Sequence, residues 1–205
     1  GFKYTTDIWP KHFSVEQKKL AVTRYKNIPE EFYSKTGYLV VTPENFLEFL
    51  TAHQNVPFRF AFQEQFSGSG RLSLQGDRLG LPVLFPVDLR YGWDLTVKRH
   101  REMIGTIRLL FRPMVKFSAP DCRHWTAASN GHPNRAKLEA ARNAERPMLE
   151  WLHLDNKEQV KFGCGALNEN GLRSQIWTQS PLSRNSEIPE FKRVRTDGCE
   201  YGYQD

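Results

Sequence analysis

Phe58-Arg-Phe-Ala-Phe-Gln-Glu-Gln-Phe-Ser-Gly-Ser-Gly-Arg-Leu-Ser-Leu74 is the stretch that decides the fold of this chain. Phe60 and Phe62 alternate with other residues as they do in a β-strand, and Leu72 and Leu74 begin the next element. The glycines between these elements allow positive φ angles and close approach of the backbone to a ligand. A strand that leads through a glycine turn into a helix is one way to hold a nucleotide-like cofactor. Two glycines can also serve packing alone, so both interpretations stay open.

Strands and helices alternate on the C-terminal side of this stretch. Apolar runs predict further strands over Leu81–Asp88, Met114–Ala119 and Val160–Leu167. Periodic apolar residues predict three helices. The first is short and ends at Gly80, the second covers about 97–111, and the third begins near Ala136 and restarts at Pro147. This order predicts an α/β fold with a mainly parallel sheet flanked by helices.

The N-terminal part of the chain is expected to be helical. Thr42-Pro43-Glu44 has the features of a helix start, with a capping hydroxyl, a proline in the first turn and an early acid. Residues 1–41 are predicted to form a helical arm, and residues 42–205 the α/β domain. The aromatic residues of the arm suit either docking on another surface or packing on the chain's own domain.

The charge balance favours acidic partners. The 205 residues include 29 Lys and Arg against 23 Asp and Glu, a formal net charge of +6. This excess predicts attraction to nucleic acid, although the basic residues are spread along the chain and also suit a solvated surface. The sequence has no apolar run long enough to span a bilayer.

Cysteine usage suggests a reducing compartment. Cys122, Cys164 and Cys199 form an odd, sparse set without a Cys-x-x-Cys pair, so neither a disulfide framework nor a metal site is predicted. We therefore expect an intracellular, reducing compartment, and the sequence leaves open which one, the nucleus or an organelle.

Several chemically interesting residues follow predicted strands. In a parallel sheet, ligands bind beyond the carboxyl ends of the strands. Phe66 to Gly70, Asp88, Cys122 and Glu169 all stand at such ends. An acid at the position of Asp88 suits hydrogen bonds from ribose hydroxyls, or it is an ordinary turn residue.

The order of these motifs resembles the cytosine-C5 methyltransferases, which use S-adenosylmethionine. The family pattern Phe-x-Gly-x-Gly fits Phe66 to Gly70, its nucleophilic cysteine fits Cys122 shortly after Pro120, and its Glu-Asn fits Glu169-Asn170. The chain also resembles methyltransferase-like segments of protist retroelement polyproteins, and the matching parts are Gly68–Ser73, Asp88–Asp94, and Ser174 with Trp177.

The resemblance implies a Rossmann-like methyltransferase fold and a role for each matched residue. S-adenosylmethionine would be held by Phe66, Gly68, Gly70, Asp88 and Asp94. Cys122 would attack the cytosine ring and Glu169 would form a hydrogen bond with it. Nucleic acid, DNA or RNA, would be the substrate or partner, with its phosphates held by Arg123 and Arg173.

Departures from the family pattern leave an alternative. Asp121 stands where the family has proline before the cysteine, Gly171 follows Glu-Asn, and no target-recognition region is recognised. An inactive methyltransferase fold, serving as a structural or nucleic-acid-binding subunit beside other proteins, is the alternative prediction. Cys122 is then a small buried hydrophobe and Glu169 a turn residue.

Two further questions stay open in the sequence. A dinucleotide-binding, dehydrogenase-like turn would need a third glycine where Ser73 stands. Trp93, Trp125 and Trp177 lie near the motifs and suit either stacking on a base or packing in the core.

Overall fold

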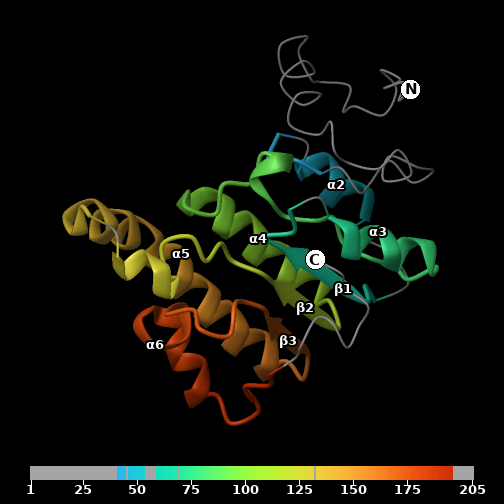
Figure 1. Cartoon of the computed structure of the whole chain (residues 1–205). Helices are drawn as coiled ribbons and strands as arrows, with labels where there is room; N and C mark the ends of the chain where they lie inside the picture. The colour runs from blue at the N-terminus through green and yellow to red at the C-terminus, as the bar shows by residue number, and fades with distance from the viewer. Residues whose placement is uncertain (1–40, 45, 54–58, 69, 132, 196–205) are drawn as a thin grey trace. The chain divides into compact units, whose positions relative to one another are not determined.

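The computed structural model describes residues 41–195, except 45, 54–58, 69 and 132 (Figure 1). The chain divides into two compact units. The first holds the described residues up to Asp121 together with Glu158–Glu169, and the second holds Cys122–Lys157 and the residues from Asn170 onward. The first unit is therefore discontinuous in sequence. The predicted arm, apart from Val41, lies outside the described residues.

A small parallel sheet forms the centre of the first unit. Its strands are β1 (Phe62–Gln65), β2 (Val115–Ser118) and β3 (Gly165–Asn168), in the order β1-β2-β3. Both pairs are parallel, with Phe62 opposite Val115 and Val115 opposite Gly165. A mixed α/β fold with a parallel sheet flanked by helices is thus confirmed.

Residues 82–87 run along the other side of β1. Parallel bridges join Phe62 to Val83 and Gln65 to Val87. Pro86 has no N–H to donate, which explains why these residues make bridges and not a continuous strand. The chain thus adds a neighbour on one side of β1 and then crosses to β2 on the other side. This reversal is a topological switch point, where α/β sheets bind ligands.

Four helical segments accompany this sheet. They are α2 (Phe46–His53), α3 (Arg71–Arg78), the 3-10 turn η3 (Leu89–Tyr91) and α4 (Lys98–Phe111). The predictions for α3 and α4 are confirmed, whereas α2 begins after the predicted Thr42-Pro43-Glu44 start.

Helix α3 packs unusually closely on the sheet at Gly76. A Cβ atom there would lie 2.5 Å from Cε1 of Phe62 and 2.7 Å from Cγ1 of Val83. A Cβ atom at this position would force the helix or these two side chains to shift. Close helix–strand packing is also the role of the third glycine in dinucleotide-binding turns. Gly76 allows such close packing here, three positions after Ser73. It was not among the predicted site residues.

An aromatic cluster fills the first unit beside α2. Trp93 is 1% exposed and stacks on Phe85 with ring centroids 5.6 Å apart. Phe46 meets the same indole edge-on at 5.8 Å. The indole N–H of Trp93 donates to the carbonyl of Val41 at 2.7 Å. Trp93 is therefore a core residue with its polar atom satisfied.

The second unit is helical. It contains η4 (Ala127–Gly131), most of α5 (Arg135–Lys161), α6 (Ile176–Gln179) and η5 (Pro181–Glu187). Helix α5 passes through Pro147 without the predicted restart, because a single proline removes one N–H and its side chain is exposed here. It continues to Lys161, so β3 begins later than predicted, after a turn with a φ of 68° at Gly163.

Trp125 anchors the second unit. Its side chain is fully buried, and its indole N–H donates to Oε2 of Glu145 at 2.7 Å. The guanidinium of Arg142 lies 5.2 Å from the ring and also donates to the carbonyl of His124 and to Oε1 of Gln175. Of the two predicted roles of Trp125, core packing is the one observed.

None of the described helices has the length and apolar character needed to cross a membrane.

Candidate functional site

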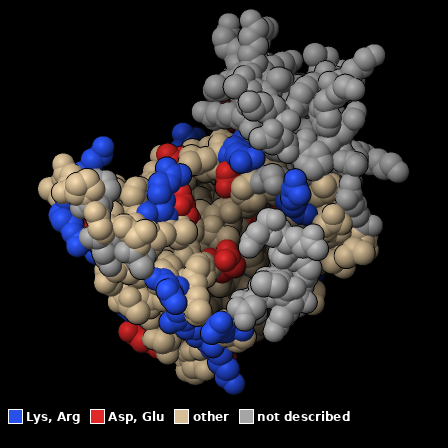
Figure 2. Space-filling model, viewed as in Figure 1, with Lys and Arg blue, Asp and Glu red and all other residues tan. Residues whose placement is uncertain are grey.

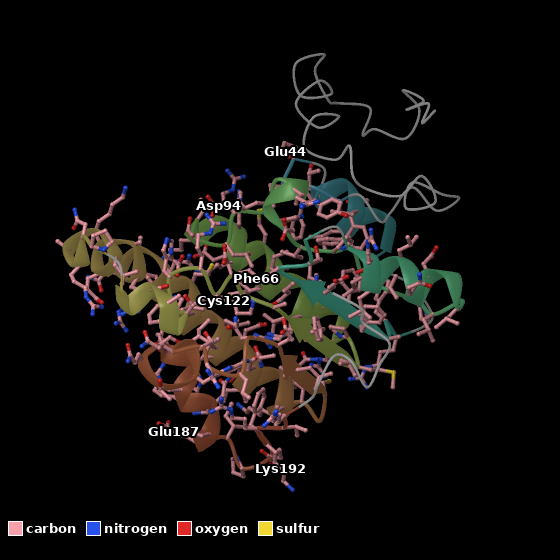
Figure 3. All side chains as sticks on the ribbon, viewed as in Figure 1. Glu44, Phe66, Asp94, Cys122, Glu187 and Lys192 are labelled. Carbon is pink, nitrogen blue, oxygen red and sulfur yellow. The ribbon has the colours of Figure 1, made fainter. Side chains whose placement is uncertain are left out.

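The glycine turn at the carboxyl end of β1 has a left-handed backbone. Phe66, Gly68 and Gly70 have φ angles of 55°, 56° and 68°. The N–H of Gly70 donates to the carbonyl of Ser67 at 2.9 Å, and Gly70 is the N-cap of α3. This conformation costs a non-glycine residue such as Phe66 about 1–2 kcal/mol. Figure 3 labels Phe66 where β1 leads into this turn. Strain of this kind occurs at ligand-binding loops.

Asp88 fixes the turn. Its Oδ2 accepts a hydrogen bond from the N–H of Gly68 at 2.9 Å, and its Oδ1 accepts one from the N–H of Arg90 at 3.0 Å. Asp88 directly follows residues 82–87 and caps η3, so it has the ordinary turn role. Each carboxylate oxygen keeps a lone pair that can accept a ribose hydroxyl. The structure thus brings together two of the predicted cofactor residues, Gly68 and Asp88.

Glu64 is a buried carboxyl group beside the same turn. It is 6% exposed, and its Oε2 accepts hydrogen bonds from the N–H and the hydroxyl of Ser73, at 2.9 Å and 2.7 Å. Burial raises the pKa of Glu64, the bonds from Ser73 lower it, and the charge of Asp88 raises it. Because Ser73 lies in the first turn of α3, Glu64 occupies the positive end of that helix.

Sequence reasoning missed the role of Glu64, although a signal was present. Gln63-Glu64-Gln65 is a polar run in a strand that is buried along these three residues. A buried acid needs a partner. The N-terminal turn of the following helix was the nearest group of donors to supply one.

Asp94 stabilises the turn that precedes α4. Its Oδ1 accepts hydrogen bonds from the N–H and the hydroxyl of Thr96, at 2.9 Å and 2.6 Å. Its own N–H donates to Nδ1 of His100 at 3.0 Å. Figure 3 shows Asp94 near the beginning of α4. The adenine contact that the resemblance implies for Asp94 stays a prediction.

Glu169 follows β3 at the carboxyl edge of the sheet. Its N–H donates to the carbonyl of Ser118 at 2.9 Å, which extends the pairing of β2 with β3 by one residue. The residue is exposed. This position agrees with the prediction that Glu169 lies at the end of a strand, and it suits both the turn role and the catalytic one.

Cys122 lies in a tight turn of the second unit. Its carbonyl accepts a hydrogen bond from the N–H of Trp125 at 2.7 Å, and its thiol is free and half-buried. Figure 3 labels it at the start of this unit. Within the same turn, Nδ1 of His124 lies 2.7 Å from Oε1 of Glu145. This carboxylate thus holds the imidazole and the indole of Trp125 together.

The predicted site residues are divided between the two units. The first unit holds Phe66, Gly68, Gly70, Asp88, Asp94 and Glu169; the second holds Cys122, Arg123 and Arg173. Arg123 and Arg173 are both exposed. Figure 2 shows Lys and Arg in several separate groups on the visible face, with Asp and Glu between some of them.

Comparisons with protein-family models, curated proteins and solved structures find no match to this chain. Among the described residues, no group of three His, Cys, Asp or Glu side chains is arranged to hold a metal ion. The fold and the chemistry of the turn therefore carry the functional argument.

Proposed function

We propose that this chain is an S-adenosylmethionine-dependent methyltransferase-like protein of Rossmann-like fold, related to the cytosine-C5 enzymes, with nucleic acid as its substrate. The observation that carries the proposal is the glycine turn at the switch point of the sheet, tied to Asp88 through the N–H of Gly68. Close packing of α3 at Gly76 adds support, because it is a feature of cofactor-binding turns.

The charges beside the turn favour a ligand without phosphate. Dinucleotide-binding turns place a pyrophosphate on the helix N-terminus. Here Glu64 already accepts from the first turn of α3, and Asp88 accepts from Gly68. The donors of this helix turn are therefore already engaged by Glu64, and the carboxylate of Asp88 would repel a phosphate and attract a positively charged sulfonium. This argues for S-adenosylmethionine over a nicotinamide dinucleotide.

The proposed reaction needs a nucleophile because cytosine C5 is otherwise unreactive. The thiolate of Cys122 would add to C6, which would make C5 nucleophilic toward the methyl group that S-adenosylmethionine supplies. A base would then remove the C5 proton, and the thiolate would leave. Glu169 would donate or share a hydrogen bond at the ring N3. In duplex nucleic acid the target base would first turn out of the stack.

The test is calorimetric titration of the purified chain with S-adenosylmethionine and, separately, with NAD. Gly68→Trp should abolish binding, because a side chain at Gly68 enters open space beside the turn. Gly80→Trp is the matched control: Gly80 also has a positive φ and open space around its Cβ, but lies beyond the C-terminal end of α3. Tighter binding of NAD than of S-adenosylmethionine would refute the proposal.

An inactive methyltransferase fold, acting as a structural or nucleic-acid-binding subunit, is the second candidate. The carboxylate of Asp94 is engaged by Thr96, and the acidic Asp121 precedes Cys122. Incubation with an oligonucleotide containing 5-fluorocytosine separates the candidates. An active enzyme forms a covalent complex that Cys122→Ala abolishes, whereas the inactive fold binds without forming one.

A further inference from the structure

Two segments of the second unit form an exposed surface of cationic and apolar side chains, here called the basic–aromatic patch. It consists of Leu172, Arg173, Trp177, Lys192 and Arg193. Nη2 of Arg193 donates to the carbonyl of Leu172 at 2.8 Å, which joins the two segments. The guanidinium of Arg193 also lies 5.9 Å from the centre of the Trp177 ring.

Trp177 is held in place while part of its ring stays accessible. Its indole N–H donates to the carbonyl of Gly171 at 3.2 Å, and the residue is half-buried. Leu172 beside it is 50% exposed, and Val194 on the facing segment is 76% exposed. A fixed aromatic ring among exposed aliphatic side chains offers a stacking surface for a flat ligand.

The cations of the patch are available to an anion. Arg173, Lys192 and Arg193 are all exposed, and within the described part of the chain none of them forms an ion pair. The acid nearest in sequence to Lys192 and Arg193 is Glu190, and the one nearest to Arg173 is Glu169. Figure 2 shows Lys and Arg gathered at the lower edge of the visible face, where Figure 3 labels Lys192.

We infer that the basic–aromatic patch binds single-stranded nucleic acid, with phosphates on Arg173, Lys192 and Arg193 and an unpaired base on Trp177. Charge complementarity selects a polyanion, and the aromatic ring selects accessible bases, which a duplex keeps inside its stack. This inference rests on the proposed function, from which it takes nucleic acid as the partner. It adds the surface that binds the nucleic acid and the preference for a single strand.

The test measures fluorescence anisotropy of labelled oligo(dT) and oligo(rU), and of the same strands paired with their complements, over a series of salt concentrations. The single strands should bind more tightly than the duplexes. Arg173→Ala and Lys192→Ala should each reduce the salt slope by about 0.7. Trp177→Leu should weaken single-strand binding about 5-fold to 150-fold. Arg99→Ala and Lys98→Ala, exposed on α4 of the first unit, are the charge-matched controls and should leave the slope unchanged.

The inference is overturned if the duplexes bind as tightly as the strands, or if the control variants reduce the slope as much as the patch variants. Calorimetry with S-adenosylmethionine on the same preparations separates the two proposals. Strand binding without cofactor binding supports the patch and removes the proposed function. Cofactor binding without strand binding overturns the patch alone.

Discussion

Replacement of Gly76 by alanine should loosen α3 from the sheet. The added Cβ would lie 2.5 Å and 2.9 Å from two carbons of the Phe62 ring and 2.7 Å from Val83, all too close for unmoved atoms. Overpacking costs about 1–3 kcal/mol, and three such contacts place this site in the upper part of that range. Alanine returns about 1 kcal/mol through its helix propensity. The expected net loss in the free energy of unfolding is therefore about 1–2 kcal/mol.

Urea denaturation followed by circular dichroism measures this loss. Gly105→Ala in α4 is the matched control, because a Cβ atom there would meet no atom within 4 Å apart from the adjacent residues and the backbone of its own helix. It should gain up to about 1 kcal/mol. The double variant Gly76→Ala with Val83→Ala should be less destabilised than the sum of its two single variants, because it removes one of the clashes. Equal stability changes for Gly76→Ala and Gly105→Ala would refute the packing argument.

Three other predictions concern single groups. Burial raises the pKa of Glu64 above its unfolded value. The stability that Glu64 contributes is therefore full below about pH 4.5 and is lost as the pH rises through the folded pKa. Glu64→Gln should flatten this pH dependence, which urea unfolding between acidic and neutral pH measures. Arg142→Lys should cost about 1.5–3 kcal/mol, because the buried guanidinium donates to three groups, whereas the exposed Arg173→Lys should cost little in the same assay. Iodoacetamide should label half-buried Cys122 faster than Cys164, which is 5% exposed. Peptide mass spectrometry measures the two rates, and faster labelling of Cys164 would contradict the burial of these two side chains.

The order of elements could be predicted from the sequence because its signals are local. Alternation around Phe62, the glycines of the turn, and Pro113 after the helix each act within a few residues. The predicted restart at Pro147 was wrong, since one proline on an exposed helix face removes only one hydrogen bond donor. The late start of β3 likewise depends on where α5 ends.

The site was less predictable because its contacts join distant residues. The proximity of Gly68 to Asp88 follows from the pairing of residues 82–87 with β1, which no local pattern specifies. Gly76 looked like any helical glycine until its face toward Phe62 was known. The pairing of Glu64 with Ser73 depended in the same way on how α3 lies over the strand.

The discontinuity of the first unit has a consequence for how the chain folds during synthesis. Strands β2 and β3 are neighbours in the sheet, yet residues 122–157 of the second unit separate them in sequence. When β2 has emerged from the ribosome, it can pair with β1 on one side. Its other edge stays unpaired until β3 has been synthesised. Pairing between such distant segments is slow, and an open edge can pair with another chain. We expect aggregation during synthesis to be most sensitive to substitutions that delay the folding of residues 122–157.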